Sequence, residues 1–496
     1  MSRCGRVAIL TGLMACGDVT GGNGSDEPRL DFVGGIPPAD TINGGGEATV
    51  LVALQTAGGS PLPDQRVVFE GPGDELAGVA QVFVATLEGN WGGPVTDTTD
   101  ANGRAGVLVY RSAAAGTAWL RVRAPALGLS DSLPFEILPG RPAEIRLTPV
   151  DTAVLVGGGF PIVARVVDRF GNTRAEAVTL AADSASLSVN GAPGAGTVTG
   201  VALGRGSVRA DGAGLTARAW VSVVPAGTLA FFIRAYDTDD SIAIVTVSTD
   251  GSGYRELFTS PFDYGSDRPL DWAPDGQSLV FHYGTNSQPF RLYHIALDGS
   301  IRRVIAQDIG GYPELHPRYG WDGWIYFTAQ TDWSIGTDEL WRVRPDGSSA
   351  MRIGLPAAPY ETDTYAAPAP DGLRVWFSTD RLNPGPEVQE LASLRLDSGT
   401  VNYLGFYGIG AVWSPQGDRV AFLDRAGAII VAAPDGSAQR VVSPGTRTYV
   451  PNLDWSPDGR WIVAAGVDGT DITDADSGLT LPLAFASRWR HPSWRP

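Results

Sequence analysis

The chain has 496 residues, of which 43% are hydrophobic and 9% aromatic. This apolar content excludes a disordered chain, and the length suffices for about three domains. A net charge of −17, with all 37 basic residues being arginine, disfavours binding to the phosphate backbone of a nucleic acid. Glycine (64 residues) and proline (36 residues) are abundant, which predicts many tight turns between short strands.

Residues 1–15 have the pattern of a secretion signal peptide. Arg3 and Arg6 precede an apolar segment of nine residues, 7–15. As a helix this segment rises only about 14 Å, which is too short to cross a bilayer. Its end, Leu-Met-Ala-Cys at 13–16, resembles the lipobox of bacterial lipoproteins, in which a peptidase cuts before the cysteine and the thiol is lipidated. The resemblance predicts lipidation of Cys16; a signal peptide with a chance cysteine is the alternative.

The cysteine count agrees with this prediction. The chain has two cysteines, Cys4 and Cys16. Cleavage removes the first and lipidation consumes the second, so we expect the mature chain to contain no disulfide. Residues 16–30 are rich in glycine and polar residues and are expected to form a flexible tether. Lipoproteins of the inner membrane tend to carry aspartate where this chain has Gly17, which favours the outer membrane.

Residues 31–140 alternate apolar and polar residues over short segments separated by Gly, Pro and Asp. The expected strands lie at 48–56, 65–71, 80–89, 105–112, 117–124 and 133–140. Six or seven such strands predict a β-sandwich. The segments at 58–70 and 98–110 resemble the bacterial Ig-like domains of invasin and intimin. In the turn at 100–103, Asp100 and Asn102 are expected to bond the local backbone and Gly103 to take positive φ.

Residues 141–225 show the same alternation and form a second unit. It contains the segment Ile-Val-Ala-Arg-Val-Val-Asp-Arg-Phe-Gly-Asn at 162–172 and a glycine-rich strand pair near its end. These features are similar to another bacterial Ig-like family, which carries a V-x-D-x-x-G-N turn. The resemblance implies a second β-sandwich that serves as a spacer or an adhesive module.

The remaining residues, 226–496, repeat one unit every 40–50 residues. Each unit has a first turn, an apolar segment and a second turn ending in Asp-Gly or Asp-Ser-Gly, which predicts one four-stranded blade of a β-propeller. We place the first turns at WAPDG (272–276), HPRYG (316–320), APAPDG (367–372), WSPQG (413–417) and WSPDG (455–459). With this placement His316 takes the position that tryptophan has in other blades.

The two ends of the repeat region complete each other. The chain finishes with Trp494-Arg495-Pro496, a repeat cut off at its turn, whereas residues 228–260 form a unit without its leading strand. We therefore expect the last strand to pair with the unit at 228–260 and to close a six-bladed ring, which removes two free sheet edges.

The repeat resembles the TolB-type propeller, whose pattern is W-S-P-D-G followed by an apolar strand. The resemblance covers 226–496, and blades three and four depart most, with HPRYG in place of the turn and no tryptophan respectively. Each tryptophan is expected to wedge between neighbouring blades and to bury about 200 Å². TolB-type propellers bind partners, but the leading domains differ here, so only the fold is carried over.

The sequence gives little evidence of a catalytic motif. The sequence has no G-x-S-x-G and no alternating βαβ region, which disfavours a serine peptidase. His282, His294, His316 and His491 form no close pair, although a metal site assembled from several blades stays an alternative. The acidic segments 237–241 and 468–478 lack the order of a calcium loop, and we interpret them as solvated turns. We expect no catalysis, no cofactor and no metal.

The sequence thus predicts an all-β protein with two Ig-like β-sandwiches followed by a six-bladed β-propeller. The function expected is a lipid-anchored binding or scaffold protein of the cell envelope that recognises a protein or glycan partner and no nucleic acid. The alternatives are a propeller lyase or hydrolase with a site in the channel, and an adhesin that binds through its Ig-like domains. The expected channel residues on the inner strands are Arg268, Asp271, Glu314, Asp454 and Arg490.

Overall fold

The computed structural model describes most of the chain from residue 27 onward. The described ranges are 27–34, 39–41, 48–71, 78–90, 93–235, 241–261, 269–285, 288–305, 313–332, 337–356, 360–382, 389–444, 449–466, 469–486 and 489–496. Within them the regular structure consists of strands β1 to β41 and two short 3-10 helices, η2 (Pro125–Leu127) and η3 (Ala484–Ala486). The described part contains no helix with the length and apolarity needed to span a membrane. The all-β class is confirmed.

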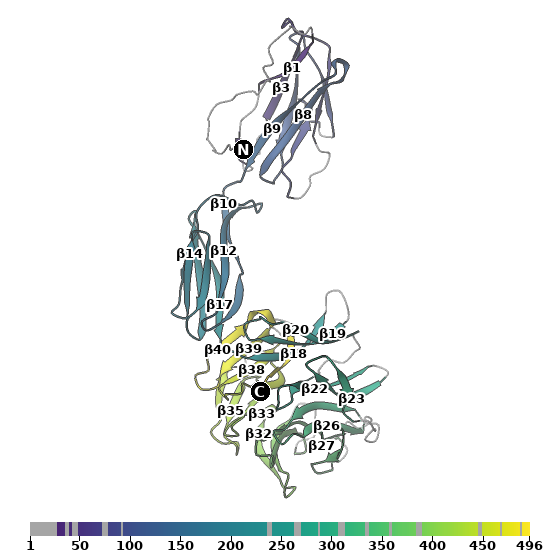
Figure 1. Ribbon diagram of the computed structural model, residues 1–496, viewed down its shortest axis with the longest axis vertical. Helices are drawn as coiled ribbons and strands as arrows, with labels where there is room; N and C mark the ends of the chain where they lie inside the picture. The colour runs from purple at the N-terminus through teal and green to yellow at the C-terminus, as the bar shows by residue number, and fades with distance from the viewer. Residues whose placement is uncertain are drawn as a thin grey trace, which may run out of the picture. The chain divides into compact units, whose positions relative to one another are not determined.

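The chain divides into two compact units. The first comprises residues 1–144 and 166–175, and the second comprises 145–165 and 176–496. The first β-sandwich belongs to the first unit. The propeller and most of the second β-sandwich belong to the second unit (Figure 1).

The first β-sandwich has two sheets around one core. Its strands are β1 (Arg29–Gly34), β2 (Ala39–Thr41), β3 (Ala48–Gln55), β4 (Arg66–Glu70), β5 (Val82–Ala85), β6 (Val95–Thr98), β7 (Arg104–Arg111), β8 (Gly116–Ala124) and β9 (Leu129–Leu138). One sheet has the order β1-β3-β7-β5 and the other β2-β9-β8-β4-β6. Alternate residues such as Val50, Val52, Leu120 and Val122 are fully buried between the sheets, as expected for strands with one face on a core.

The turn before β7 has the predicted chemistry. Asp100 Oδ1 accepts hydrogen bonds from the backbone N–H of Asn102 at 2.8 Å and of Arg104 at 2.9 Å. Gly103 has φ of 71°, and a Cβ there would lie 2.5 Å from the carbonyl oxygen of Leu54, so only glycine fits. The prediction for this turn is confirmed.

The second β-sandwich has two four-stranded sheets. Its strands are β10 (Pro142–Thr148), β11 (Asp151–Leu155), β12 (Gly159–Asp168), β13 (Thr179–Ala182), β14 (Leu187–Ala192), β15 (Ala195–Gly200), β16 (Gly204–Gly212) and β17 (Leu215–Val224). The sheet orders are β10-β12-β15-β14 and β11-β17-β16-β13.

The predicted Asp…Gly-Asn turn follows β12. Asp168 Oδ1 accepts hydrogen bonds from the backbone N–H of Phe170 at 2.8 Å and of Asn172 at 2.9 Å, and Oδ2 accepts one from the N–H of Gly140 at 2.7 Å. Burial acts to raise the pKa of Asp168, but the bonds from Asn172 and Gly140 outweigh it and hold the pKa below its ordinary value. The turn is therefore stabilised by an ionised, buried aspartate.

The propeller has six four-stranded blades, which confirms the predicted architecture (Figure 1). Blade 1 comprises β18 (Thr228–Ala235), β19 (Ser241–Ser248), β20 (Arg255–Pro261) and β41 (Trp489–Trp494); blade 2, β21 (Leu270–Trp272), β22 (Ser278–Thr285), β23 (Gln288–Ala296) and β24 (Ile301–Arg303); blade 3, β25 (Glu314–Tyr319), β26 (Ile325–Asp332), β27 (Thr337–Val343) and β28 (Met351–Arg352); blade 4, β29 (Asp363–Pro368), β30 (Arg374–Thr379), β31 (Glu390–Arg395) and β32 (Val401–Tyr407); blade 5, β33 (Ile409–Trp413), β34 (Val420–Leu423), β35 (Ile429–Ala432) and β36 (Arg440–Ser443); and blade 6, β37 (Tyr449–Trp455), β38 (Trp461–Gly466), β39 (Gly469–Asp474) and β40 (Thr480–Leu483).

The last strand of the chain closes the ring. β41 pairs antiparallel with β18, with Leu229 opposite Trp494 and Ala230 opposite Ser493. β41 also contacts β37 of blade 6 and β21 of blade 2, and each remaining inner strand contacts the next around the axis. The predicted closure by the C-terminal strand is confirmed.

The blades are held together by a repeated contact around the tryptophans of the first turns. Trp455 of blade 6 packs in one apolar cluster with Val412 and Leu423 of blade 5, and only 3% of it is exposed. Its Nε1 donates a hydrogen bond to Val412 O at 3.1 Å, and the guanidinium of Arg419 lies 5.2 Å from the ring centroid. The tryptophan wedges between blades as predicted, and an arginine of the preceding blade covers its ring.

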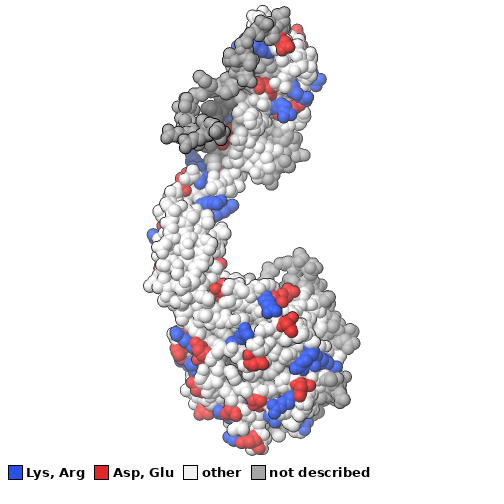
Figure 2. Space-filling view, in the orientation of Figure 1, with Lys and Arg blue, Asp and Glu red and all other residues white. Residues whose placement is uncertain are grey.

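Charged side chains do not separate into large patches on the visible face of the propeller. Acidic and basic residues are interspersed there (Figure 2). The net charge of −17 is therefore not gathered into one patch on this face.

Candidate functional site

Two backbone hydrogen bonds define equivalent positions in five blades. In blade 6, Ser456 N donates to Trp461 O at 2.8 Å and Gly459 N donates to Ser456 O at 2.8 Å. The residues that make the same pair of bonds at the start of the turn in blades 2 to 5 are Ala273, Gly320, Ala369 and Ser414. Counting from these residues aligns the inner strands without reference to sequence similarity.

This alignment corrects the placement of blade 3. The turn there is Gly320–Gly323, since Gly320 N donates to Trp324 O at 2.7 Å and Gly323 N donates to Gly320 O at 2.9 Å. The segment HPRYG at 316–320 belongs mostly to the inner strand β25, so Tyr319, and not His316, takes the tryptophan position. The sequence prediction was wrong because this turn is one residue shorter and has Trp321 in place of proline.

The aligned residues form three layers around one mouth of the channel. The position before the tryptophan carries Asp271, Arg318, Ala367, Val412, Asp454 and Ser493 in blades 2 to 6 and the closing strand. The tryptophan position carries Trp272, Tyr319, Pro368, Trp413, Trp455 and Trp494. Outermost lie Pro274, Trp321, Pro415, Pro457 and Pro496. All but Ser493 line one cavity of about 80 Å³. The mouth therefore has a polar inner layer and an apolar outer layer.

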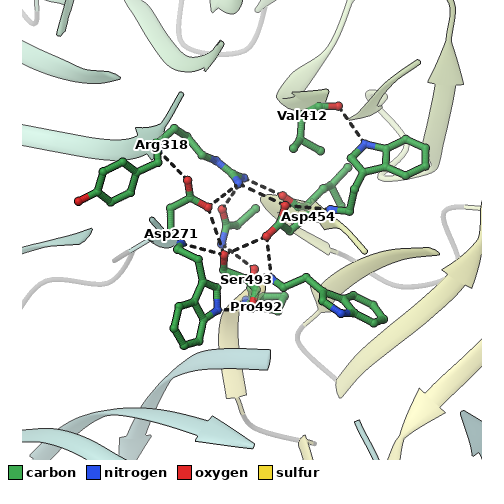
Figure 3. Close-up of polar contacts among 12 residues, drawn as sticks. Asp271, Arg318, Val412, Asp454, Pro492 and Ser493 are labelled. Atoms are coloured by element: carbon green, nitrogen blue, oxygen red, sulfur yellow. Dashed lines mark hydrogen bonds and ion pairs between the residues drawn. The ribbon is translucent and has the colours of Figure 1, made fainter. Parts of the chain in front are cut away.

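The inner layer of this cavity, which we call the floor, is built on a hydroxyl between two carboxylates (Figure 3). Ser493 Oγ lies 3.1 Å from Asp271 Oδ1 and 2.9 Å from Asp454 Oδ2. Asp271 Oδ2 also accepts a bond from Tyr319 N at 2.7 Å, and Asp454 Oδ2 accepts one from Trp494 N at 2.7 Å. Because these groups come from four blades, the floor ties the closing strand to its neighbours on both sides.

Arg318 provides the positive charge of the floor. Its Nη1 lies 3.4 Å from Asp271 Oδ1 and 3.9 Å from Asp454 Oδ1. Its Nη2 donates to Asn452 Oδ1 at 2.9 Å and to Leu453 O at 2.7 Å, so the guanidinium reaches across from blade 3 to blade 6 (Figure 3). With both carboxylates ionised, the floor has one negative charge in excess.

The two carboxyl groups influence each other. Burial raises the pKa of Asp271 to about 7; the charge of Arg318 opposes this rise, and the neighbouring Asp454 adds to it. Burial also raises the pKa of Asp454, against the effect of Arg318. The pair is thus able to hold a proton near neutral pH, which an isolated aspartate does not do.

Comparisons with known proteins found similar solved structures. No family model and no curated protein matches the sequence. Among solved structures, TolB from Acinetobacter baumannii is 16% identical, with 64% of this chain and 83% of that chain covered and a TM-score of 0.45. A nidogen/laminin complex is 10% identical, with 54% and 99% covered and a TM-score of 0.41. An oligogalacturonate lyase in complex with manganese is 14% identical, with 52% and 73% covered and a TM-score of 0.33. These likenesses concern the fold alone.

Below the floor, the residues two positions before the floor residues on the inner strands form a further ring, and the channel is narrower there. It contains Pro269, His316, Tyr365, Gly410 and Asn452, which line a cavity of only about 10 Å³. His316 stacks on Tyr365 with ring centroids 4.3 Å apart. His316, Tyr365 and His491 have φ between 50° and 54°, and their strands have register shifts at these positions. The side chains of His316 and Tyr365 line the cavity where the backbone bulges, and the channel is nearly filled at this level.

The other predicted channel residues are placed differently. Glu314 is fully buried and accepts a hydrogen bond from Leu292 N at 2.8 Å, with Arg291 Nε 3.8 Å away; it lines neither cavity. Arg490 donates to Gly466 O at 2.7 Å and likewise lines neither cavity. Arg268 and Cys16 lie outside the described residues. Of the predicted channel residues that the structure describes, only Asp271 and Asp454 line the same cavity.

The interpretation of the acidic segment 468–478 as solvated turns is correct only for its end, where Asp476 and Ser477 are exposed in the turn after β39. Residues 469–474 form β39, which is buried throughout, and Asp471 and Asp474 are 2% and 1% exposed. Asp474 Oδ1 accepts bonds from the N–H of Asp476 and Ser477 at 2.9 Å each. Most of the segment 237–241 lies outside the described residues. In the part that the structure describes, no three His, Cys, Asp or Glu side chains are placed to hold a metal.

Sequence reasoning missed Arg318 and Ser493, which complete the floor. Both follow from aligning the repeats on the residue before the tryptophan position. Arg318 was hidden by the misplaced turn of blade 3, and Ser493 lies in the incomplete repeat at the end of the chain. The departures of these two repeats from the pattern were the signal that could have identified them.

Proposed function

We propose that the protein is a lipid-anchored binding protein of the bacterial cell envelope whose propeller recognises a protein or glycan partner at the mouth of its channel. The observation that carries this proposal is the cavity of about 80 Å³ with a charged floor and an apolar outer layer. Concave sites of this kind, with few polar groups at their base, are typical of ligand recognition.

Binding without catalysis agrees with the bonding of the floor. Each oxygen of Asp271 and Asp454 accepts at least one hydrogen bond from the protein. The carboxylates are thereby fixed as parts of the ring, and a proton transfer would have to break bonds that join blades. A recognition site uses such fixed groups, some of whose oxygens can accept a further hydrogen bond from a bound partner.

A capture experiment tests the site. The full chain, immobilised and exposed to solubilised envelope extract, is compared with the variants Trp321→Ala at the mouth and Trp119→Ala on the first β-sandwich. Both tryptophans are exposed, at 46% and 58%, so neither substitution should unfold the protein. We expect a partner that is retained by the parent chain and by Trp119→Ala and lost from Trp321→Ala. Equal retention by all three would exclude the mouth as the site.

The cellular location is a further part of the proposal and rests on the lipobox-like sequence at 13–16. A lipid chain contributes about 0.8 kcal/mol for each buried methylene, so several acyl chains hold a protein firmly on a membrane. Cys16→Ser should release the protein into the soluble fraction, and membrane retention of the variant would contradict the anchor. Gly17 after the cysteine favours the outer membrane.

The adhesin alternative has one observation in its favour. Trp119 in β8 and Trp220 in β17 are 58% and 45% exposed on the outer faces of the two β-sandwiches. Exposed aromatic side chains are frequent in binding surfaces. Capture of the same partner by residues 31–224, and not by 225–496, would favour the Ig-like domains over the propeller.

A further inference from the structure

We propose that the channel mouth recognises a lysine side chain of a protein partner, with the ammonium group at the floor and Trp321 at its entrance. This inference rests on the proposed binding function and specifies the chemistry of its partner. The steps that carry it are the charge of the floor, the acceptor capacity of its carboxylates and the dimensions of the mouth.

The charge of the floor favours a cation. Asp271 and Asp454 offset Arg318 and leave one negative charge in excess, while Ala367 and Val412 complete this layer without any charge. Arg318 is not available to an anion, because its Nη2 already donates to Asn452 and Leu453 and its Nη1 lies between the two carboxylates. Charge complementarity therefore selects a single positive group.

The carboxylates retain acceptor capacity on the side of the cavity. Their side chains are 11% and 15% exposed, and both line the cavity. Asp271 Oδ2 accepts one hydrogen bond, from Tyr319 N, and Asp454 Oδ1 accepts one, from Trp455 N. A carboxylate oxygen has two lone pairs, so each has room for one further donor. An ammonium group has three donors and matches this arrangement.

Trp321 supplies a free aromatic surface at the entrance. Trp272, Trp413 and Trp455 each have an arginine guanidinium over the ring, at 5.5, 4.8 and 5.2 Å from the centroid. Trp321 has no such cation among the described residues, and 46% of it is exposed. A cation or its alkyl chain that enters the cavity can lie against this indole. Blade 3 therefore differs from the repeat at Arg318 and Trp321. These two residues distinguish this mouth from that of a propeller with six regular repeats.

The dimensions favour a side chain of a larger partner. The cavity of about 80 Å³ has room for several water-sized groups, so it admits the end of a side chain. Around it the outer layer of prolines and Trp321 offers apolar surface for the rest of the partner. The chain itself contains no lysine, as all 37 basic residues are arginine, so a second copy cannot supply the proposed group.

The test uses the full chain carrying Cys16→Ser and three capped tripeptides, Gly-Lys-Gly, Gly-Nle-Gly (norleucine, without the charge) and Gly-Glu-Gly. Calorimetric titration should show the lysine peptide binding at least tenfold more tightly than the other two. Trp321→Ala should weaken it about threefold, whereas the control Trp119→Ala leaves it unchanged. Asp271→Asn should weaken it about tenfold, with Asp435→Asn, in an exposed turn of blade 5, as its control. Equal binding of lysine and norleucine, or tighter binding of glutamate, would overturn the proposal.

Two further measurements complete the test. n-Butylammonium should bind more weakly than the lysine peptide; if it binds as tightly, the site takes free amines and the protein partner is refuted. Binding of the lysine peptide should weaken as the pH falls from 8 to 6, because protonation of Asp271 competes with binding of the cation. The other titratable groups at or next to the floor are Asp454, Arg318 and Tyr319. If the lysine peptide does not bind but the captured partner is still lost from Trp321→Ala, the proposed function stands and only the ligand chemistry is wrong.

Discussion

The hydroxyl of Ser493 lies 2.9 Å from Asp454 Oδ2, so the closing strand is bound to the neighbouring blade. The same hydroxyl lies 3.1 Å from Asp271 Oδ1 on the other side. A propeller closed without a covalent link depends on such contacts, because the strand that completes the ring is otherwise free to leave.

Replacing this hydroxyl should weaken the closure. Ser493 is fully buried, and Ser493→Ala removes the hydroxyl that lies between the two carboxylates, which should lower the free energy of unfolding by about 1–3 kcal/mol. Thermal unfolding followed by circular dichroism measures the effect. Ser437→Ala, in an exposed turn, is the control and should stay within about 0.5 kcal/mol of the parent. Equal stability of both variants would show that the hydroxyl has no role in closure.

The whole strand should matter more than one hydroxyl. Deletion of residues 489–496 leaves β18 with an unpaired edge that contains Leu229 and Phe232. Unpaired apolar edges associate with other chains, so we expect a lower melting temperature and dimers or larger species in light scattering after gel filtration. Deletion of 495–496 alone keeps β41 and should leave the protein monomeric at the same concentration, provided that the parent is a monomer. A fully monomeric and stable product of the longer deletion would refute closure by this strand.

The fold was predictable because the turns of each repeat require particular residues at fixed positions. Gly459 and Gly276 have φ of 69° and 64°, and each ends a turn that Pro and Asp begin. Such local requirements leave a clear pattern in the sequence. Asp271 and Asp454 were predictable for the same reason, since both immediately precede the tryptophan of a regular repeat.

The predictions that were wrong concern residues whose position depends on other parts of the chain. Glu314 was expected in the channel, but a bulge between Leu315 and Arg318 changes which side chains of β25 face the axis. Asp471 and Asp474 were assigned to solvent from their charge, although β39 is covered on both faces. Register shifts and burial result from packing between blades, which a single repeat does not encode.

Two tryptophans at equivalent positions allow a matched test of the contacts between blades. Trp455 and Trp413 are 3% and 4% exposed, and an arginine covers each ring. Trp455 Nε1 donates to Val412 O, whereas Trp413 Nε1 is buried without a partner among the described residues. Trp455→Phe should therefore cost about 1 kcal/mol more than Trp413→Phe in chemical denaturation. Equal costs would show that the indole hydrogen bond contributes nothing to the contact.

The stability of the propeller should depend on pH through the floor. Burial raises the pKa of Asp271 from 3.8 to about 7, so between these values the folded protein binds a proton that the unfolded chain does not. The free energy of unfolding must then fall as the pH rises from about 4 to about 7, and the contribution is constant above that range. Because other groups also titrate there, the measurement is the difference between the parent and Asp271→Asn at each pH.

Asp271→Asn removes this titration, so the advantage of the parent should decrease with rising pH across this window. Asp435→Asn, at an aspartate whose pKa is lowered by hydrogen bonds from Ser437, is the control and should show no such trend above pH 5. A difference that stays constant from about pH 5 to pH 7 would mean that Arg318 holds Asp271 ionised throughout. In that case the floor keeps its excess negative charge even in acid, and recognition of a cation at the mouth should lose its dependence on pH as well.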